Sequence, residues 1–416
     1  MTPTLSELTR TFARIGVMSF GGPAAQIALM HREVVDQRKW VSEKDYLSAL
    51  SFCMLLPGPE AMQLATWIGW RSHGTVGGLI AGGLFVLPGA LVVLALSVLY
   101  AGLGDLPLVA ALFTGVQAAV VAVVIEALIR VSKRALKTRT HRAIAVAAFL
   151  ALSVFALPFP LVILAAGIFG AMGAAEVITG LPTPAVPLGS SLKTAAIWGA
   201  VWLLPLAALW VFEGGLLAEI GLYFSKLAVL TFGGAYAVLA WMAQEVVAVK
   251  GWLTTTEMMD GLGLAETTPG PLILVTEFVG FLAAWKAGGW LMGLGGAAVA
   301  LWMTFAPCFL WIFLGAPYLK RLTHAPRLAA ALAGIMAAVV GVIANLSLWF
   351  ALHVLFATLT SATFGPVSLL LPDLASLKPV AAVLALASGY LLLRRHWPLP
   401  WVLALTAGAS ALLSTV

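Results

Sequence analysis

Ser19-Phe20-Gly21-Gly22-Pro23 recurs in the chain as Thr231-Phe232-Gly233-Gly234-Ala235, at an offset of 212 in residue number. The flanking residues keep the same offset, and the pairs include Phe12 with Phe224, Arg14 with Lys226, Trp40 with Trp252, and Pro57-Gly58-Pro59 with Pro269-Gly270-Pro271. A fixed spacing over this length is typical of an internal repeat. The chain therefore contains two copies of one unit.

Beyond these motifs the offset rises to 219. Pro88 then corresponds to Pro307, and Gly115 corresponds to Gly334. The run Ala118-Ala119-Val120-Val121 likewise corresponds to Ala337-Ala338-Val339-Val340. A seven-residue insertion within residues 282–290 explains the change.

The composition is that of a membrane protein with many spans. Hydrophobic residues make up 62% of the chain and charged residues 10%, whereas soluble domains have about 25% charged residues. The net charge of +6 comes from basic residues in short loops, where they orient membrane spans, so we expect no nucleic-acid partner. No cleavable signal peptide is expected in residues 1–10. Cys53, Cys308 and the six histidines lack ligand spacing, so we expect no metal and no cofactor.

The paired motifs resemble those of a known family. A Phe-Gly-Gly-Pro turn, a downstream Trp and then Pro-Gly-Pro is similar to the pattern of the chromate ion transporter (CHR) family, and the duplicated length resembles its long-chain, two-domain members. The resemblance covers roughly residues 5–355, with Ala235 in place of the proline. It implies chromate as substrate, sulfate as a related or competing anion, and outward transport that confers resistance.

Each copy begins with two broken helices. The sequence predicts helices at 5–19 and 23–38, and fifteen helical residues rise only about 22 Å, against a hydrocarbon core of about 30 Å. A re-entrant hairpin with Gly21-Gly22 at its tip fits better than two spans. A second hairpin starts at Ser42-x-x-Asp45, which mirrors Thr254-x-x-Glu257 as a capping box, and breaks at Pro57-Gly58-Pro59.

Ordinary spans are predicted at 75–100, 107–130, 143–159, 160–179, 193–212, 377–393 and 397–415, with a proline-rich loop at 181–188. The expected fold is all-α: a polytopic membrane protein with two inverted repeats and broken, re-entrant helix hairpins at the midplane. The expected domains are repeat 1 at 1–141, connecting helices at 142–213, repeat 2 at 214–357, and C-terminal helices at 358–416.

Charges at the loops predict the inversion. Three spans separate the copies, and an odd number inverts the second. The first copy carries Arg32, Arg38, Lys39 and Lys44 around Trp40, whereas Lys250 is the only Lys or Arg within residues 243–257. The loop at 130–142 carries six basic residues, but the equivalent segment after Trp349 has none until Lys378. Lys320, Arg321 and Arg327 show the opposite bias, since the first-copy turn at 103–106 has no basic residue. We expect a bacterial-type inner membrane, with the N-terminus in the cytoplasm.

The helix breaks predict an oxyanion site. Broken backbone within a bilayer is tolerated where it is buried in protein or lines a wet cavity, and half-helix N-termini offer N–H donors and a positive dipole end. Tight packing turns are the alternative explanation. The candidate substrate-binding residues from these motifs are Ser19, Phe20, Gly21, Gly22, Pro23, Pro57, Gly58, Pro59, Thr231, Phe232, Gly233, Gly234, Pro269, Gly270 and Pro271.

Side chains near the tips extend this site. Arg14 and Lys226 each lie seven residues, about two helical turns, before a Gly-Gly pair, so they are candidate substrate-binding cations; snorkelling to the headgroups is the alternative. The hydroxyls of Ser19 and Thr231 either reach the anion or bond back to their own helices.

Four acids lie in apolar stretches, and each is a candidate for proton coupling: Glu60, Glu126, Glu266 and Glu277. A carboxyl group in a low dielectric can carry a proton, and the alternative is a carboxylate paired with Arg14, Lys226 or a helix N-terminus.

The sequence therefore predicts a secondary carrier of tetrahedral oxyanions rather than an enzyme, with the lipid bilayer as its surroundings and a homodimer as a possible assembly. An oxyanion uptake carrier is one alternative. The others are a channel or scaffold and an intramembrane enzyme acting on a phosphorylated lipid, although the scattered acids disfavour an enzyme.

Overall fold

The computed structural model describes residues 2–104, 106–173, 187–232, 235–319, 325–365 and 367–414. Gly233, Gly234, Lys320, Arg321, Asp105 in the turn at 103–106, and residues 181–186 of the proline-rich loop lie outside this part. Five helical segments are long and apolar enough to cross a membrane: Glu60–Leu103, Pro107–Ala135, Leu188–Phe212, Leu272–Tyr318 and Pro326–Leu355. These helices confirm an all-α polytopic membrane protein.

The two copies have the same order of elements. The first consists of α1 (Leu5–Met18), α2 (Gly22–His31) with a π-helical end (Arg32–Gln37), α3 (Glu43–Cys53), α4 (Glu60–Leu103) and α5 (Pro107–Ala135). The second consists of α9 (Leu216–Leu230), α10 (Ala235–Gln244) with a π-helical end (Glu245–Val249), α11 (Thr255–Thr267), a 3-10 turn (Leu272–Leu274), α12 (Val275–Gly315) and α14 (Pro326–Leu355). Both predicted helix breaks therefore occur in each copy.

Both long helices are in fact helical hairpins. The chain leaves helical geometry at His73-Gly74 within α4 and at Gly288-Gly289 within α12. From Pro59 to Gly74 the residue number rises by 15, and from Pro271 to Gly289 it rises by 18. In the return arms the residue number rises by 14 from Gly74 to Pro88 and by 18 from Gly289 to Pro307. The seven extra residues thus divide three and four, which lengthens each arm by about one turn.

The ends of the short helices also match between the copies. Thr254 and Glu257 form a complete capping box, with the Glu257 carboxylate accepting from the Thr254 N–H at 2.7 Å. Ser42 accepts from the N–H of Asp45 at 3.1 Å. Past each π-helical segment a cation stacks on a tryptophan, with Arg38 5.6 Å from the centre of the Trp40 ring. The equivalent Lys250 lies 5.5 Å from the centre of the Trp252 ring.

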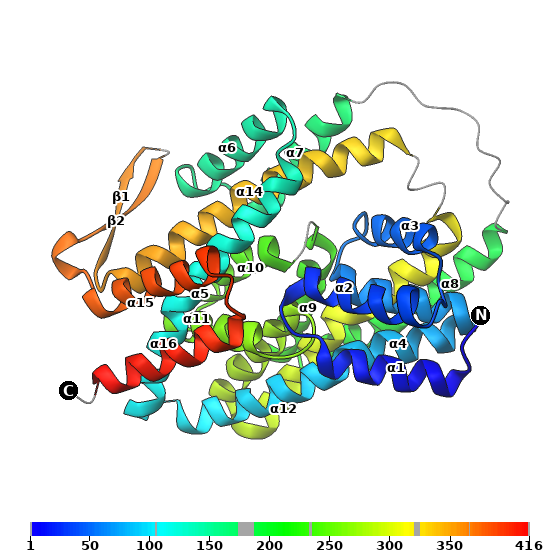
Figure 1. The fold of residues 1–416 in the computed structure, drawn as a ribbon, viewed down its shortest axis with the longest axis horizontal. Helices are drawn as coiled ribbons and strands as arrows, with labels where there is room; N and C mark the ends of the chain where they lie inside the picture. Colours follow the sequence, from blue (N-terminus) through cyan, green and yellow to red (C-terminus); the bar gives the residue numbers. More distant parts are fainter. Residues whose placement is uncertain are drawn as a thin grey trace. The chain divides into compact units, whose positions relative to one another are not determined.

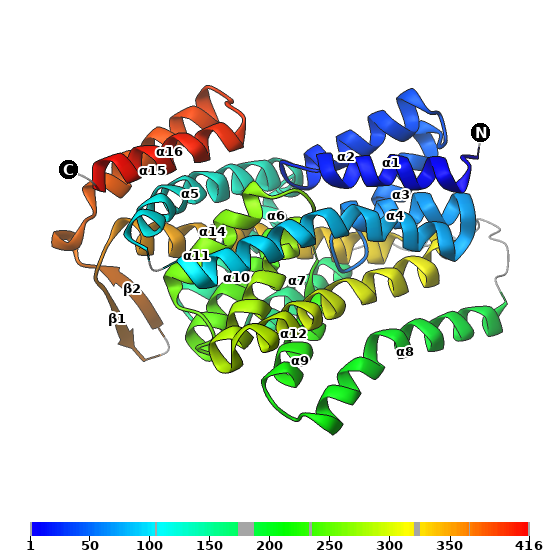
Figure 2. The same cartoon turned by 90° about the horizontal axis from the view of Figure 1, so that it is seen from below.

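Contacts divide the chain into two compact units, and each unit takes elements from both copies. Unit 1 comprises Met1–Ala101, Glu176–Val238 and Leu264–Pro326. Within it, α1 and α2 return beside each other from the turn at Gly21 (Figures 1 and 2). Gly16 of α1 packs on Leu84 of α4, and α12 packs on α9 and α8 (Leu188–Phe212).

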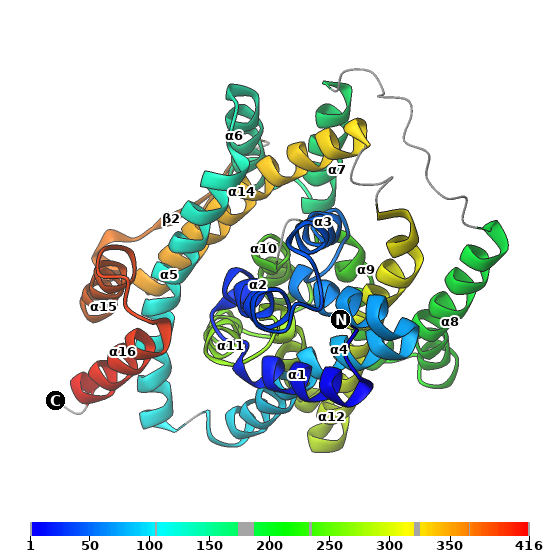
Figure 3. The same ribbon diagram turned by 45° about the vertical axis from the view of Figure 1, so that its right-hand side comes forward.

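Unit 2 comprises Gly102–Ala175, Leu239–Gly263 and Arg327–Val416. It contains α5, α14, and the pairs α6 (Arg139–Ser153) with α7 (Phe159–Met172) and α15 (Pro379–Gly389) with α16 (Leu399–Ser414). Gly115 of α5 packs against Thr406 of α16, whereas its repeat equivalent Gly334 packs against Ala166 of α7. The α5 span of the first copy therefore packs against the pair α15–α16, whereas the α14 span of the second copy packs against the pair α6–α7 (Figure 3).

One element departs from the predicted helices. Strands β1 (Leu359–Phe364) and β2 (Val367–Pro372) form an antiparallel hairpin, with Phe364 opposite Val367. The stretch contains Thr, Phe and Val, which suit strands. Because it is also rich in apolar residues, its sequence resembles that of a membrane span. Helices were expected from residue 358, but the predicted spans at 377–393 and 397–415 agree with α15 and α16.

Candidate functional site: the interlocked tips

The two copies exchange backbone hydrogen bonds at their helix breaks, within unit 1. The Gly270 N–H of the second copy donates to the Ser19 carbonyl of the first at 2.8 Å. Reciprocally, the Gly58 N–H of the first copy donates to the Thr231 carbonyl of the second at 2.7 Å. Each Pro-Gly-Pro break is therefore held by the glycine-rich tip of the other copy.

Glycine is required at both donor positions. Gly58 has a φ of +120° and Gly270 a φ of +90°, which disfavour residues with a side chain. A Cβ at Gly58 would lie 2.8 Å from the Sγ of Cys308, and one at Gly270 would lie 3.3 Å from the Cα of Gly89. Cys308 and Gly89 are themselves repeat equivalents, at the larger of the two offsets. The two breaks thus have equivalent surroundings.

The hydroxyls at the tips bond to their own helices. Ser19 Oγ donates to the Ile15 carbonyl at 2.7 Å, and Thr231 Oγ1 donates to the Leu227 carbonyl at 2.6 Å. This is the second of the two roles considered for them. In this conformation the backbone carbonyls of Ser19 and Thr231, rather than their hydroxyls, join the two copies.

The first-copy tip presents open backbone. Gly21 and Gly22 have φ values of +87° and +76°, no side chain caps α2, and a Cβ at Gly22 would meet open space. Phe20 is 45% exposed. Phe232, Pro23 and Pro57 are half-buried, and Pro59, Pro269 and Pro271 are buried. The first-turn N–H groups of α2 can therefore receive an anion, whereas those of Gly58 and Gly270 are engaged within the protein.

Two glutamines that were absent from the sequence candidates support the tips. Gln26 Nε2 donates to the Gly270 carbonyl at 2.6 Å, and Gln63 Nε2 donates to the Pro57 carbonyl at 2.7 Å. Both side chains are buried. A signal for them exists in the sequence: each is an amide three or four residues after a tip proline, in an otherwise apolar run.

The paired cations lie on exposed faces of their helices. Arg14 on α1 and Lys226 on α9 are both exposed, in contrast to their neighbours Ile15 and Leu227. Neither belongs to an ion pair formed by the described residues. Within that part of the chain no carboxylate neutralises either cation, and no contact joins one cation to the other.

The four candidate acids differ in their surroundings. Glu126 accepts from Arg130 at 2.5 Å and is 36% exposed, and Glu266 accepts from the Tyr236 hydroxyl at 2.8 Å. Glu60 is half-buried at the start of α4. Glu277, in the first turn of α12, is 1% exposed, and its Oε2 has no hydrogen-bond partner among the described residues.

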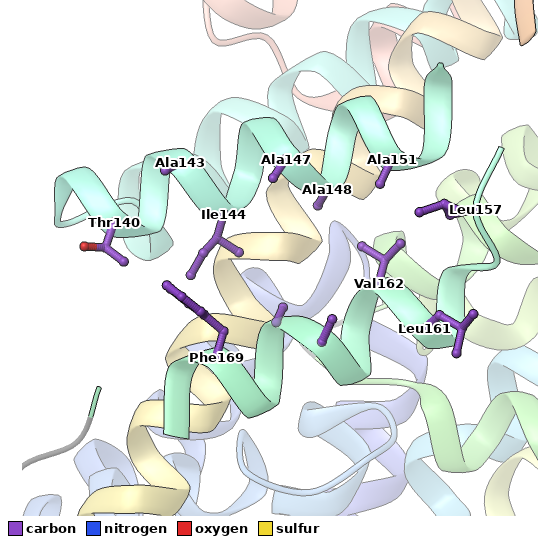
Figure 4. A pocket seen from close by; sticks show the side chains of 12 residues that line it. Thr140, Ala143, Ile144, Ala147, Ala148, Ala151, Leu157, Leu161, Val162 and Phe169 are labelled. Carbon is purple, nitrogen blue, oxygen red and sulfur yellow. The ribbon is translucent and has the colours of Figure 1, made fainter. Parts of the chain in front are cut away.

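A groove between α6 and α7 offers little to an anion. Its lining is alanines and larger apolar side chains, with the Thr140 hydroxyl at one end (Figure 4). Within the described part of the chain, no group of three His, Cys, Asp or Glu side chains could hold a metal.

The chain is similar to known transport proteins along most of its length. A family model described as "Chromate transporter" matches residues 6–171 and 218–412. The "Chromate transport protein" of Cupriavidus metallidurans is 31% identical over 353 residues, covering 82% of this chain and 81% of that protein. Its namesake in Pseudomonas aeruginosa is 33% identical over 346 residues, covering 81% and 79%. The "Probable chromate transport protein" of Synechococcus elongatus is 31% identical over 362 residues, covering 82% and 83%. No solved structure is significantly similar. The chain belongs to the chromate transporter family.

Proposed function

We propose that this protein is a secondary carrier that exports chromate across the inner membrane in exchange for protons, with sulfate as a competing anion. The interlocked tips carry the proposal. The Pro-Gly-Pro break of each copy is tied to the tip of the other copy by an equivalent bond, Gly270 to Ser19 and Gly58 to Thr231. Such a joint, between inverted repeats, would let one copy move against the other around a fixed site.

In this mechanism the tips supply backbone donors and the cations supply charge. The open N–H groups at Gly21-Gly22 would hold oxyanion oxygens, and Arg14 and Lys226 would raise the local concentration of a dianion. At an effective dielectric of about 20, a unit cation about 7 Å from a dianion contributes roughly 5 kcal/mol before desolvation is subtracted. About a quarter of that energy would change affinity by close to tenfold.

Arg14→Ala and Lys226→Ala are each expected to weaken chromate binding several-fold in folded, membrane-inserted protein. Arg14→Lys should keep part of the affinity, because the charge remains without the planar fork of donors. Equilibrium binding of radiolabelled chromate measures this effect. Normal binding by both alanine variants would show that the cations have no part in holding the anion.

Glu277 is the acid whose surroundings best suit a proton carrier. An ionised carboxylate is costly to bury unless donors or a cation offset the burial. Glu277 Oε2 is buried without a donor from the described residues, whereas Glu126 and Glu266 have partners in Arg130 and Tyr236. In this conformation Glu277 would hold a proton, which it would release when the site opens to water.

The inverted arrangement predicts the sidedness of two exposed positions. Lys39 and Lys250 follow the π-helical ends of equivalent helices in the two copies. Cysteines placed there should react with an impermeant maleimide from opposite sides of the membrane, with Lys39 on the cytoplasmic side. The native Cys53 and Cys308 are buried, so background labelling of these two cysteines by the maleimide should be small. Labelling of both positions from one side would contradict the inversion and the placement of the N-terminus.

Counterflow in proteoliposomes tests the function directly. Vesicles loaded with chromate should take up labelled chromate, unlabelled sulfate should compete, and an imposed pH gradient should drive net flux in one direction. Uptake of sulfate without chromate exchange would indicate an uptake carrier. Chemical cross-linking in the same vesicles would show whether the carrier is a homodimer.

A further inference from the structure

Unit 2 contains a cavity of about 370 Å³ beneath the β-hairpin. Its walls come from the end of α6, the end of α10, one face of α14, and both strands. The Ser368 N–H donates to the Val154 carbonyl at 2.7 Å, which seats β2 on the end of α6. All of its lining residues belong to unit 2, and none of them belongs to the interlocked tips.

The lining of this cavity is polar yet uncharged. Six of its side chains carry hydrogen-bonding groups: Ser153, Gln244, Asn345, Trp349, Ser361 and Ser368. The other lining residues are apolar, so no carboxylate repels an anion there. Amide, hydroxyl and indole groups can all donate hydrogen bonds.

Asn345 places its side-chain amide at the wall of the cavity. The side chain lines the cavity and the residue is 6% exposed, yet its amide forms no hydrogen bond to the described residues. Buried amides in proteins are normally hydrogen-bonded. A polar ligand or water within the cavity would supply the missing partner.

The same position in the first copy has the opposite chemistry. Asn345 and Trp349 correspond, at the larger offset, to Glu126 and Arg130, which form an ion pair. The second copy thus replaces an ion pair with a neutral amide and an indole at the edge of a cavity. The β-hairpin follows α14, whereas α5 is followed by α6, so the two copies also differ after these equivalent helices.

From these observations we propose that the cavity beneath the β-hairpin is a second, weaker oxyanion site, on the non-cytoplasmic side of the protein. The proposal rests on the proposed export function and on the inverted topology, and it adds a second anion site to them. Neutral donors hold an oxyanion less tightly than cations do. Passage is fast when each site binds strongly enough to be entered and weakly enough to be left. A cavity lined by neutral donors would meet that requirement.

Three substitutions in the full-length protein test this site. Asn345→Leu keeps the approximate size and removes the amide, while Asn345→Asp keeps the shape and adds a negative charge. Ser361→Ala removes a lining hydroxyl on an exposed strand, where folding is not at risk. Ser153→Ala is the matched control, because its Oγ lines the same cavity but already donates to the Phe149 carbonyl at 2.7 Å.

Chromate exchange is measured in proteoliposomes with the anion presented at either face. Asn345→Leu should raise the half-saturating chromate concentration about three- to tenfold at the non-cytoplasmic face. Asn345→Asp should raise it further, Ser361→Ala should raise it about twofold, and Ser153→Ala should match the unmodified protein. The cytoplasmic face should be unaffected in all four variants.

Equilibrium dialysis of the purified proteins with labelled chromate provides a readout that is independent of transport. The unmodified chain should show a tight and a weak class of sites, and Asn345→Asp should lose the weak class. If Asn345→Asp loses the weak class of sites but the unmodified chain exchanges no chromate, the proposed carrier function is wrong and the second binding site is supported. If Asn345→Asp binds chromate as the unmodified chain does, the cavity holds water or a cation and the proposal is wrong.

Discussion

Replacing Gly270 by alanine is expected to abolish chromate transport almost completely. The residue has a φ of +90°, and its N–H holds the Ser19 carbonyl at 2.8 Å. A side chain in that conformation costs roughly 1–3 kcal/mol, and loss of the hydrogen bond adds about 1 kcal/mol. The new Cβ would also press on Gly89. Together these effects correspond to about a hundredfold loss of the conformation in which Gly270 is hydrogen-bonded to Ser19. The initial rate of chromate exchange in proteoliposomes measures this loss.

Gly83→Ala is the control for this prediction. Gly83 lies in the return arm of α4, where a Cβ would meet nothing within 4 Å. Alanine there should leave transport unchanged and stabilise the helix by up to about 1 kcal/mol. Gly58→Ala should resemble Gly270→Ala, because it interrupts the reciprocal bond. Full activity of Gly270→Ala would mean that the joint between the copies has no part in transport.

Replacing Glu277 by glutamine is expected to remove the dependence of chromate flux on pH while leaving chromate binding intact. Glutamine has nearly the same shape and cannot carry a proton. If the Glu277 carboxyl couples proton movement to chromate movement, an imposed pH gradient should no longer drive net chromate flux in the variant. Exchange of chromate for chromate should continue. Driven flux should fall about tenfold or more, and flux in vesicles at several imposed gradients measures it.

Glu126→Gln serves as the comparison for Glu277. Glu126 is half-exposed and already paired with Arg130, so its loss should leave driven flux unchanged. If Glu277→Gln retains the pH response of the unmodified protein, the coupling group lies elsewhere, and the same experiment on Glu60 and Glu266 would find it.

The repeat motifs predicted the helix architecture because they break helices for local reasons. Proline at the start of α2, two glycines of positive φ before it, and Pro-Gly-Pro before α4 each act within a few residues. The seven-residue insertion was also visible, because it shifts the repeat spacing. The structure shows in addition that the shift is shared between two arms of a hairpin, which the spacing alone does not reveal.

The contacts at the candidate site could not be predicted from the sequence. The bond between Ser19 and Gly270 joins residues that lie more than half the chain apart, and no local pattern states which tip meets which break. The sequence placed Arg14 and Lys226 on one face with their glycine tips, but exposure depends on which faces of α1 and α9 pack. Gln26 and Gln63 were missed because single amides in apolar runs resemble ordinary variation.

The reciprocal bonds at the tips constrain how a nascent chain can mature. When the ribosome has produced the first copy, the Ser19 carbonyl and the Gly58 N–H are both in place but lack their partners, Gly270 and Thr231, which emerge only with the second copy. Until the second half is made, the first half therefore lacks both hydrogen bonds that join the copies. The same geometry leaves each half, when alone, without the partners of its own tip and break. Two separately synthesised halves should regain their native tips by meeting in the membrane.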